Sequence, residues 1–317
     1  MGESVLWPAD HLAYPHLPVL YQEILNALLP QSPGLYVDGT IGAGGHAWGI
    51  LENSAPEGRL LGLDVDPLAL SITRDRLKKF EDRFTLVRAS YLTLTDQIHA
   101  LGWHEVNGIL LDLGVSSMQI NTAERGFSFL ADGPLDMRLD PDQTQTAADL
   151  INHLSEEDLS KLIWEFGEER FSRRIARAIV QSRPLKTTGE LADLIRKTAG
   201  SHHDRIHPAT RTFQAIRIAL NGELSNLSST LPQAISNLAR GGRLAIISFH
   251  SLEDRIVKHT FQRESKDCIC PPEQPVCICN HHASVKILTR HPLEAGEEEL
   301  KVNPRARSAR LRVVEKI

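Results

Sequence analysis

The stretch Val37-Asp-Gly-Thr-Ile-Gly-Ala-Gly-Gly-His46 decides the fold of this chain. The residues Leu35–Asp38 around its start have the character of a short buried strand, and a helix is expected from about Ala47. Glycines between a strand and a helix let the backbone turn sharply and approach a bound cofactor closely. The stretch therefore predicts a strand, a glycine-rich turn and a helix, the unit with which nucleotide-binding α/β folds begin.

Later segments repeat this alternation of strand and helix. Apolar residues run almost continuously through four further strand candidates, namely Arg59–Asp66, Phe84–Ala89, Gly108–Leu113 and Arg243–Phe249. Residues Leu68–Phe80 have helical spacing, and the final strand candidates are Val285–Leu288 and Leu311–Val314. Such strands, alternating with helices, predict an α/β fold with a parallel, doubly wound sheet that is covered on both faces.

A long insertion separates the fourth strand candidate from the fifth. The gap is about 125 residues, far more than one crossover helix requires. Most of it looks helical, and Ser155-x-x-Asp158 and Thr187-x-x-Glu190 have the pattern of N-terminal helix caps. We therefore expect a core of residues 1–125 and 218–317, and an inserted helical subdomain of residues 126–217 at the carboxyl end of the sheet, where ligands bind.

The charge of the chain is unevenly distributed. The 317 residues carry a net charge of −5, but residues 170–217 hold eleven Lys and Arg against three acids, 11 − 3 = +8. The last seventeen residues hold six against one, 6 − 1 = +5. Two basic patches on an acidic body fit a polyanion such as RNA. The composition is that of a globular chain, without a leader sequence or a membrane span, so we expect a cytoplasmic protein.

One basic patch has helical periodicity. Arg170, Arg173, Arg174 and Arg177 fall at i, i+3, i+4 and i+7, which predicts one stripe of a helix, with Phe171 pointing elsewhere. Such a stripe can follow the phosphates of RNA. The alternative is a solvated face that is paired with acids, for instance Glu169 with Arg173. We favour RNA, and the further candidates for RNA binding are Arg211, Arg305, Arg307 and Arg310.

Two cofactors compete for the glycine turn. The spelling Gly42-x-Gly44-x-x-Ala47 fits a dinucleotide fingerprint, which would indicate a nicotinamide-dependent oxidoreductase. That fingerprint runs from the strand directly into its first glycine, whereas here the strand ends four residues earlier, at Asp38. The pattern Asp-x-Thr-x-Gly-x-Gly is instead similar to the first motif of class I methyltransferases, which bind the cation S-adenosylmethionine. Asp64, twenty residues after Gly44, is placed to accept hydrogen bonds from ribose hydroxyls.

The segment Asp112-Leu-Gly-Val-Ser-Ser117 follows the fourth strand and is expected to face the reactive end of the cofactor. If the reaction transfers a methyl group to an exocyclic amine of a base, that amine is a poor nucleophile, because its lone pair is delocalised into the base ring. An acceptor for its N–H would localise that lone pair as a methyl group arrives. Asp112, Ser116 and Ser117 are the catalytic candidates; the alternative is a strand-end cap for Asp112 and a turn for the serines.

All four cysteines lie in one short segment, Cys268, Cys270, Cys277 and Cys279, spaced C-x-C-x6-C-x-C. This spacing differs from the C-x2-C pairs of structural zinc sites. We therefore predict no metal site, with these cysteines as the candidates if one exists and His281 and His282 as further ligands. The alternative is a Pro-rich surface loop with free thiols, and we assign the segment no catalytic role.

Long motifs then follow one order along nearly the whole chain, which resembles the RsmH (MraW) family of bacterial 16S ribosomal RNA cytosine-N4 methyltransferases. Besides the segments at 37–46 and 112–117, the matching motifs are His16–Leu20, Glu124–Phe129, Asp132–Arg138, Gly167–Arg170, Arg174–Val180, His207–Arg211, Ser248–Lys258 and Asn303–Ser308. Met118 departs from the proline that is common in the family, and Asp64-Val-Asp66 departs from the frequent Asp-Arg-Asp.

The resemblance implies a class I fold, S-adenosylmethionine as the methyl donor, and N4 of the decoding-centre cytidine at position 1402 as the acceptor. It implies cofactor contacts at Gly44, Gly45, His46, Asp64, Tyr91, Asp112 and Gln119. An aromatic side chain at Tyr91 could stack on adenine. The expected partner is 16S rRNA or the small ribosomal subunit, bound by a monomer or a homodimer. A nicotinamide-dependent oxidoreductase and a non-catalytic RNA-binding module remain as alternatives.

Overall fold

The computed structural model describes residues 17–199, 207–271, 273–274 and 276–317. His16 and residues 200–206 of the basic stretch lie outside these described residues. The chain forms two compact units, each described here by itself: unit 1 is Met1–Gly114 with Ser225–Ile317, and unit 2 is Val115–Leu224. The sequence predicts an inserted subdomain of residues 126–217, whereas unit 2 of the structure extends further at both ends. In the described part of the chain, no helix has the length and apolar character needed to cross a membrane.

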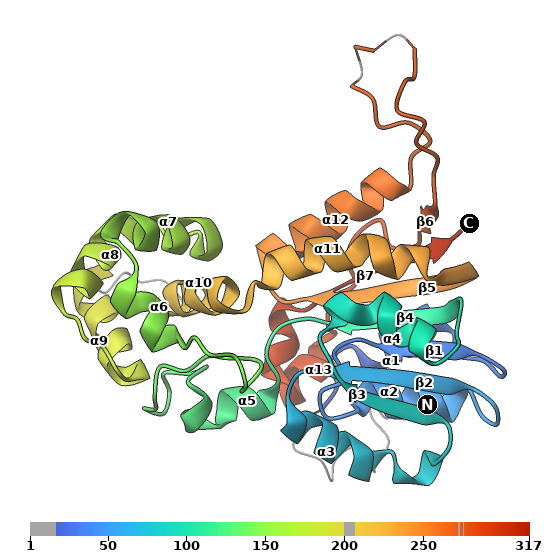
Figure 1. The fold of residues 1–317 in the computed structure, drawn as a ribbon, viewed down its shortest axis with the longest axis horizontal. Coiled ribbons are helices and arrows are strands. Elements are labelled where there is room, and N and C mark those ends of the chain that lie inside the picture. The colour runs from blue at the N-terminus through green and yellow to red at the C-terminus, as the bar shows by residue number, and fades with distance from the viewer. Residues whose placement is uncertain (1–16, 200–206, 272, 275) are drawn as a thin grey trace. The chain divides into compact units, whose positions relative to one another are not determined.

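Unit 1 is built on a seven-stranded sheet with the order β3-β2-β1-β4-β5-β7-β6 (Figure 1). The strands are β1 (Leu35–Asp38), β2 (Arg59–Asp64), β3 (Phe84–Arg88), β4 (Val106–Asp112), β5 (Leu238–Ser248), β6 (Val285–Ile287) and β7 (Arg310–Lys316). All seven strand candidates of the sequence are present. β1 to β5 pair in parallel, as predicted, whereas β7 runs antiparallel to both of its neighbours. The expectation of a purely parallel sheet is wrong at β7, because the connection from β6 stays at the carboxyl edge and the chain must return in the opposite direction.

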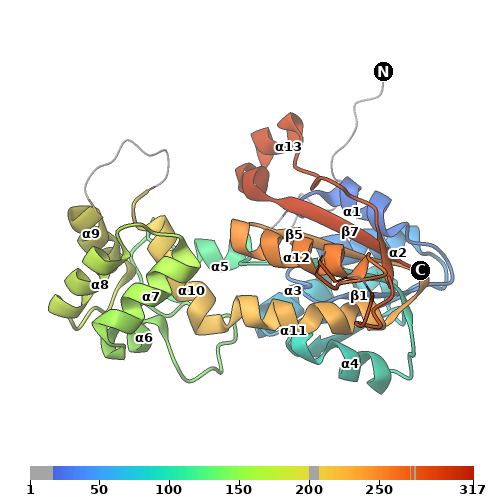
Figure 2. The same ribbon diagram turned by 90° about the horizontal axis from the view of Figure 1, so that it is seen from above.

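Helices cover both faces of this sheet. Those of unit 1 are α1 (Tyr21–Leu28), α2 (Gly45–Asn53), α3 (Pro67–Arg76), α4 (Leu94–Ala100), α11 (Glu223–Ser236, in unit 1 from Ser225 onward), α12 (Ser251–Glu264) and α13 (Glu297–Val302). Neighbouring strand residues alternate between two apolar clusters: Tyr36 packs with α1 and α2, and Val37 packs with α4, α11 and α12. Figure 2 shows α1 and α4 on opposite sides of the sheet, so the expected burial of both faces is confirmed.

Unit 2 is helical. It contains α5 (Ser117–Asn121), α6 (Ala147–His153), α7 (Glu156–Gly167), α8 (Ser172–Gln181), α9 (Thr188–Ala199) and α10 (Thr210–Asn221), with its own apolar core. Both caps predicted from the sequence are confirmed. The Ser155 hydroxyl accepts from the Asp158 N–H at 3.0 Å, and the Thr187 hydroxyl accepts from the Glu190 N–H at 3.2 Å.

Candidate functional site

Three carboxylates stand at the carboxyl edge of the sheet in unit 1. Asp38, Asp64 and Asp112 are the last residues of β1, β2 and β4, which are neighbours in the order β2-β1-β4. The chain leaves β1 for β2 on one side, and β4 lies on the other, so the strand order reverses here. In open α/β sheets such a switch point forms the crevice that binds ligands. The carboxylates therefore gather where the sequence predicts a cofactor.

The glycine turn after β1 is fastened to both neighbouring strands. The Gly39 N–H donates to the carbonyl of Leu110 on β4, and the Ile41 N–H donates to the carbonyl of Leu63 on β2, both at 2.9 Å. The Thr40 hydroxyl accepts from the N–H of Asp112 at 2.6 Å. The turn thus holds the three strand ends in register and fixes the backbone of Asp112, which explains why threonine stands within it.

Asp64 organises this turn as well as facing the crevice. One of its carboxylate oxygens accepts from the Gly42 N–H and the other from the Asp66 N–H, both at 2.9 Å. Burial raises the pKa of Asp64 to about 6, although these backbone hydrogen bonds lower it. Each carboxylate oxygen has a second lone pair, so the side chain can still accept from a ligand hydroxyl. The sequence indicated the ligand role of Asp64 but not its support of the turn.

The glycines of the turn serve different purposes. Gly44 has a φ of +73°, and a Cβ placed there would lie 2.9 Å from the side chain of Thr73 on α3. A Cβ at Gly45 would lie 3.0 Å from the side chain of Pro18. A Cβ at Gly42 would meet only the carbonyl oxygen of Thr40, at 3.8 Å. Gly44 and Gly45 therefore lack side chains because protein atoms pack against them, while the α-carbon of Gly42 borders open space.

A second cluster joins Asp38, His46 and Asp112. Asp38 is 2% exposed, and its carboxylate accepts from the Thr40 N–H at 3.2 Å. Burial raises the pKa of Asp38 to about 7; the nearby His46 lowers it, and the charges of Asp112 and Asp64 raise it. His46 Nε2 lies 3.7 Å from an Asp112 oxygen, and the ring stacks on Tyr21 with centroids 6.3 Å apart. Sequence reasoning left Asp38 out of the site, although an acid directly before a glycine turn is a usable signal.

Some buried polar atoms of this cluster have no hydrogen-bond partner. Within the described part of the chain these include both ring nitrogens of His46 and the Oδ1 atom of Asp112. Buried polar atoms are normally satisfied, so unpaired ones beside a crevice indicate a missing ligand. Tyr91 lies in a short 3-10 turn (Tyr91–Thr93) after β3. This residue is beside Gly39, because a Cβ added at Gly39 would lie 3.3 Å from the Tyr91 Cβ.

The candidates Ser116, Ser117 and Gln119 lie at the start of unit 2. Ser116 is the N-cap of α5: its hydroxyl accepts from the Gln119 N–H at 3.2 Å, while Gln119 Oε1 accepts from the Ser116 N–H at 3.0 Å. This reciprocal pair is a capping box. The Ser116 hydroxyl therefore caps a helix, which agrees with the alternative of a structural role in a turn rather than a catalytic role.

The arginine stripe differs from the prediction at its first member. α8 begins at Ser172, so Arg170 precedes the helix, and only Arg173, Arg174 and Arg177 share its surface. Phe171 packs against the apolar core of unit 2, as expected, but the guanidinium groups of Arg170 and Arg174 also lie 4.8 Å and 5.6 Å from its ring centroid. A cation over an aromatic face is a favourable contact that helical periodicity does not include.

The acids near this stripe take other partners than expected. Glu169 does not pair with Arg173; it is buried, and its carboxylate accepts from the N–H of Phe171 at 2.8 Å. Arg177 does pair with an acid, Glu156 of α7, at 3.2 Å. Both partners of that pair are largely exposed, so it contributes little stability and exchanges readily with solvent or another anion.

The remaining arginine candidates are all exposed. Arg211 lies on α10 in unit 2, and Arg305 and Arg307 lie in the 3-10 segment Pro304–Ser308 of unit 1. Arg310 opens β7 and faces acids, with Asp254 at 3.4 Å and Glu294 at 3.8 Å. Its charge is therefore partly neutralised.

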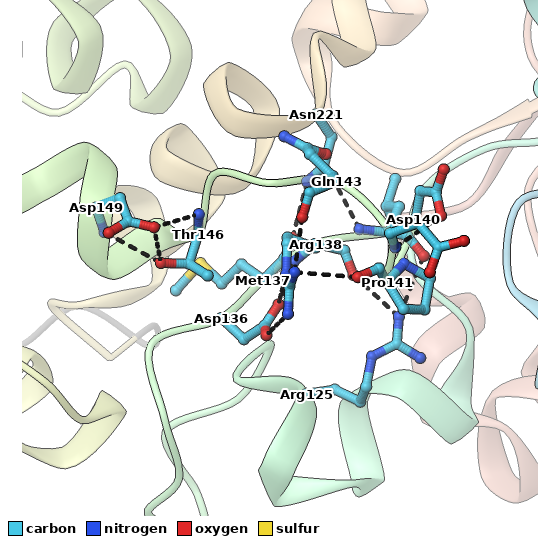
Figure 3. A network of polar contacts seen from close by, with 12 residues as sticks. Arg125, Asp136, Met137, Arg138, Asp140, Pro141, Gln143, Thr146, Asp149 and Asn221 are labelled. Atoms are coloured by element: carbon cyan, nitrogen blue, oxygen red, sulfur yellow. Dashed lines mark hydrogen bonds and ion pairs between the residues drawn. The ribbon is translucent and has the colours of Figure 1, made fainter.

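The loop from Phe127 to Met137, which contains most of the motif Asp132–Arg138, packs against the apolar core of unit 2. The ring of Phe129 lies 4.6 Å from that of His207 and 4.9 Å from that of Phe213, and Met137 is 1% exposed. Arg138 binds Asp136 through two hydrogen bonds, of 2.9 and 2.6 Å, in the network of Figure 3. The motif thus supports the structure of this unit.

The four cysteines are brought together at the surface of unit 1. Their sulfur atoms all lie within 4.8 Å of one another, a grouping that the unusual spacing did not predict.

Residues 13–317 match the model of the MraW methylase family. The chain is 53% identical over 306 residues to "Ribosomal RNA small subunit methyltransferase H" of Dehalococcoides mccartyi, covering 96% of this chain and 88% of the relative. It is 52% identical over 312 residues to the protein of the same name from Heliobacterium mobile, covering 96% and 100%. Among solved structures, an rRNA methylase from Streptococcus thermophilus superposes loosely, with a TM-score of 0.43 and 11% identity over 96% of this chain and 99% of that one.

Proposed function

The chain belongs to the MraW methylase family, and from this membership we infer that it is a small-subunit ribosomal RNA methyltransferase. It transfers a methyl group from S-adenosylmethionine to N4 of a cytidine in 16S rRNA, and we place that cytidine at position 1402. The observation that carries the chemistry is the edge of the sheet, where three carboxylates surround a glycine turn. This arrangement suits a cationic methyl donor.

The alternative cofactor fits this edge poorly. A nicotinamide dinucleotide would bring its pyrophosphate to the start of α2, beside Asp38, Asp64 and Asp112. Like charges at such a short range in a partly dry site repel strongly. A non-catalytic RNA-binding module, in turn, has no use for a cluster of buried and half-buried carboxylates beside unpaired polar atoms.

The residues present fit S-adenosylmethionine. When bound, this cofactor supplies an electrophilic methyl group on a sulfonium. Asp64, held by two backbone N–H groups, would accept from the ribose hydroxyls, and Tyr91 would stack on adenine. Asp38 and Asp112 would face positive charge, which lowers the pKa of the buried Asp38 carboxyl. We assign His46, Gln119 and the backbone at Gly44 and Gly45 to the same site, since the first N–H groups of a helix have no acceptor within it.

For the acceptor base, we propose Asp112 as the catalytic residue. Its Oδ1 atom has no partner within the described chain, while its backbone is fixed by Thr40 and its Oδ2 lies 3.7 Å from His46. Oδ1 would accept an N–H of the cytidine amine and localise the nitrogen lone pair. The new N–C bond would form as the methyl C–S bond breaks, with that electron pair left on sulfur; one N–H bond then breaks, and Oδ1 holds the proton before it passes to water. Ser117 is a second acceptor candidate, and Ser116 is committed to its cap.

We further propose that unit 2 recognises the RNA. Arg173, Arg174 and Arg177 form an exposed cationic face on α8, with Arg170 just before it. Arg211 is a further exposed cation of unit 2, and Arg305 and Arg307 are exposed cations of unit 1. These groups would bind phosphates, while the target base leaves its stack to reach the methyl group. The substrate is free 16S rRNA or the small subunit in the cytoplasm, and the enzyme acts as a monomer or a homodimer.

The test separates binding from chemistry. Small subunits that lack this methylation are incubated with the enzyme and labelled S-adenosylmethionine, and the modified cytidine is located by mass mapping of the RNA. Asp112→Ala should lower kcat by about 10²–10⁴, the range of a lost acid–base group, with a much smaller loss of cofactor affinity. Asp64→Ala should mainly weaken cofactor binding, measured by calorimetry. An Asp112→Ala enzyme with an unchanged rate would exclude the proposed role.

A further inference from the structure

The cysteine segment connects the end of α12, at Glu264, to the start of β6, at Val285. Figure 1 shows this connection standing away from the sheet. The chain has four cysteines, and the segment contains all of them: Cys268, Cys270, Cys277 and Cys279. One C-x-C pair comes before and the other after a turn in which the Gln274 N–H donates to the Pro271 carbonyl at 2.9 Å. Exposed loops rarely collect every cysteine of a protein by chance.

The sulfur atoms are spaced for a shared ligand. Cys277 and Cys279 have their sulfurs 3.5 Å apart, those of Cys279 and Cys268 are 3.9 Å apart, and all four lie within 4.8 Å of one another. A tetrahedral zinc site with Zn–S bonds of about 2.3 Å requires sulfur–sulfur separations of about 3.8 Å. A disulfide requires about 2.0 Å. The distances match one tetrahedral metal and do not match disulfides, and the cysteines are unpaired.

Backbone N–H groups already point at two of these sulfurs. The Cys270 N–H donates to the sulfur of Cys268, and the Ile269 N–H donates to the sulfur of Cys279, each at 3.4 Å. Hydrogen bonds of this kind stabilise thiolate charge and orient metal ligands. A thiol has little need of them, whereas a metal-bound thiolate does.

The limbs of the segment are tied together independently of the thiols. The Ser284 N–H donates to the Glu264 carbonyl at 2.8 Å, and the Ala283 N–H donates to the Asp267 carboxylate at 3.2 Å. His281, a further ligand candidate, has its Nδ1 2.8 Å from the Lys266 carbonyl oxygen and its Nε2 3.6 Å from Glu264. His281 is therefore engaged at the base of the segment, which leaves a site of four sulfurs.

We propose that Cys268, Cys270, Cys277 and Cys279 bind one Zn²⁺ ion in a closed, structural site. Four thiolates with no open position are typical of structural zinc, which makes no bond to a substrate. A mononuclear centre is favoured over an iron–sulfur cluster, because a cluster spreads its cysteines over several iron atoms. The role of the metal is to hold the exposed segment in one conformation.

The strand register places this site away from the methyl-transfer chemistry. β6 begins with Val285 beside Lys316, and the neighbouring Glu315 pairs with Arg243, near the amino-terminal part of β5. The three carboxylates stand at the carboxyl ends of the parallel strands. The metal site is therefore at the amino-terminal end of the parallel strands, opposite to the carboxylates, and removal of the metal should leave cofactor binding intact.

The experiment measures metal content and cofactor binding together. The full chain, without a metal-binding tag, is analysed by elemental mass spectrometry, and Co²⁺ is then exchanged into it. We expect about one Zn²⁺ per chain, and Co²⁺ absorption bands of a tetrahedral tetrathiolate site. The double variant Cys268→Ser/Cys279→Ser should lose the metal and keep its affinity for S-adenosylmethionine. Val276→Ser, on an exposed residue of the same segment, is the matched control and should keep the metal.

Each other outcome overturns part of the proposal. A native protein that holds no metal after purification, binds no added Zn²⁺ and has four thiols that react freely with a thiol reagent has no site. Stoichiometric iron in place of zinc would refute the choice of metal. A cysteine variant that loses cofactor affinity while the control retains it would refute the purely structural role. Far-ultraviolet circular dichroism confirms that the variant is folded.

Discussion

The affinity for S-adenosylmethionine should depend on pH through the carboxylates at the sheet edge. A cationic cofactor binds their ionised forms, so affinity falls as they become protonated. With a pKa of about 7, Asp38 is ionised in about nine of ten molecules at pH 8 and in about one of ten at pH 6. Asp64, with a pKa of about 6, is almost fully ionised at pH 8 and half ionised at pH 6. Binding should therefore weaken about tenfold through Asp38 and about twofold through Asp64, or about twentyfold together.

Isothermal titration calorimetry at pH 6, 7 and 8 and constant ionic strength measures this dependence. Asp38→Asn keeps an oxygen that accepts from the Thr40 N–H but removes the titrating charge, so its pH dependence should shrink to about the twofold share of Asp64. Titration of the cofactor's own amino group affects both proteins equally and cancels in their ratio. S-adenosylhomocysteine, which lacks the sulfonium charge, should show a weaker dependence. If the two proteins weaken by the same factor, Asp38 does not face the bound cation.

Three other perturbations test the supports of the fold and the RNA face. Arg312→Met removes the cation that binds the buried carboxylate of Asp254 at 2.6 Å and leaves it only the more exposed Arg310, at 3.4 Å, so the free energy of unfolding in urea titrations should fall by up to about 3–5 kcal/mol. Gly44→Ala should lower the melting temperature more than Gly42→Ala: both have positive φ, which costs about 1–2 kcal/mol, but only Gly44 lacks space for a Cβ. Arg174→Ala should weaken binding to 16S rRNA and reduce its salt dependence by about one phosphate contact, without changing cofactor affinity measured by calorimetry; an unchanged salt slope would remove α8 from the interface.

The fold was predictable to the extent that it follows from apolar runs. β1 to β5 are visible in the sequence because strands buried on both faces are almost continuously apolar. The direction of β7 was not predictable, because direction depends on where a connection crosses the sheet and not on the strand's own composition. Helical spacing likewise misplaced Arg170, since it contains no information on where α8 begins.

The candidate site was predictable where the position of a residue follows from its strand. Asp64 and Asp112 were placed at the cofactor edge because each ends a predicted strand there. Asp38 was missed because its neighbours in space, His46 and the two other carboxylates, come from separate strands and a helix. The cysteine grouping was missed for a related reason: the C-x-C spacing resembles no common zinc pattern, yet two such pairs facing each other across a turn bring four sulfurs together.

The acidic edge destabilises the fold when no ligand is bound, and this decides which ligand belongs there. Asp38 has an ordinary pKa of 3.8 and a pKa of about 7 in the fold. Ionisation of Asp38 therefore lowers the free energy of unfolding by an amount that grows as the pH rises from about 4 to about 7, and this loss persists at higher pH. Asp64 behaves alike over a narrower range, up to about pH 6. Near neutral pH the empty fold holds carboxylates that repel one another in a poorly hydrated edge. A pyrophosphate would add to this repulsion, whereas a sulfonium and an ammonium group remove it, so the edge is built to gain free energy from a cation.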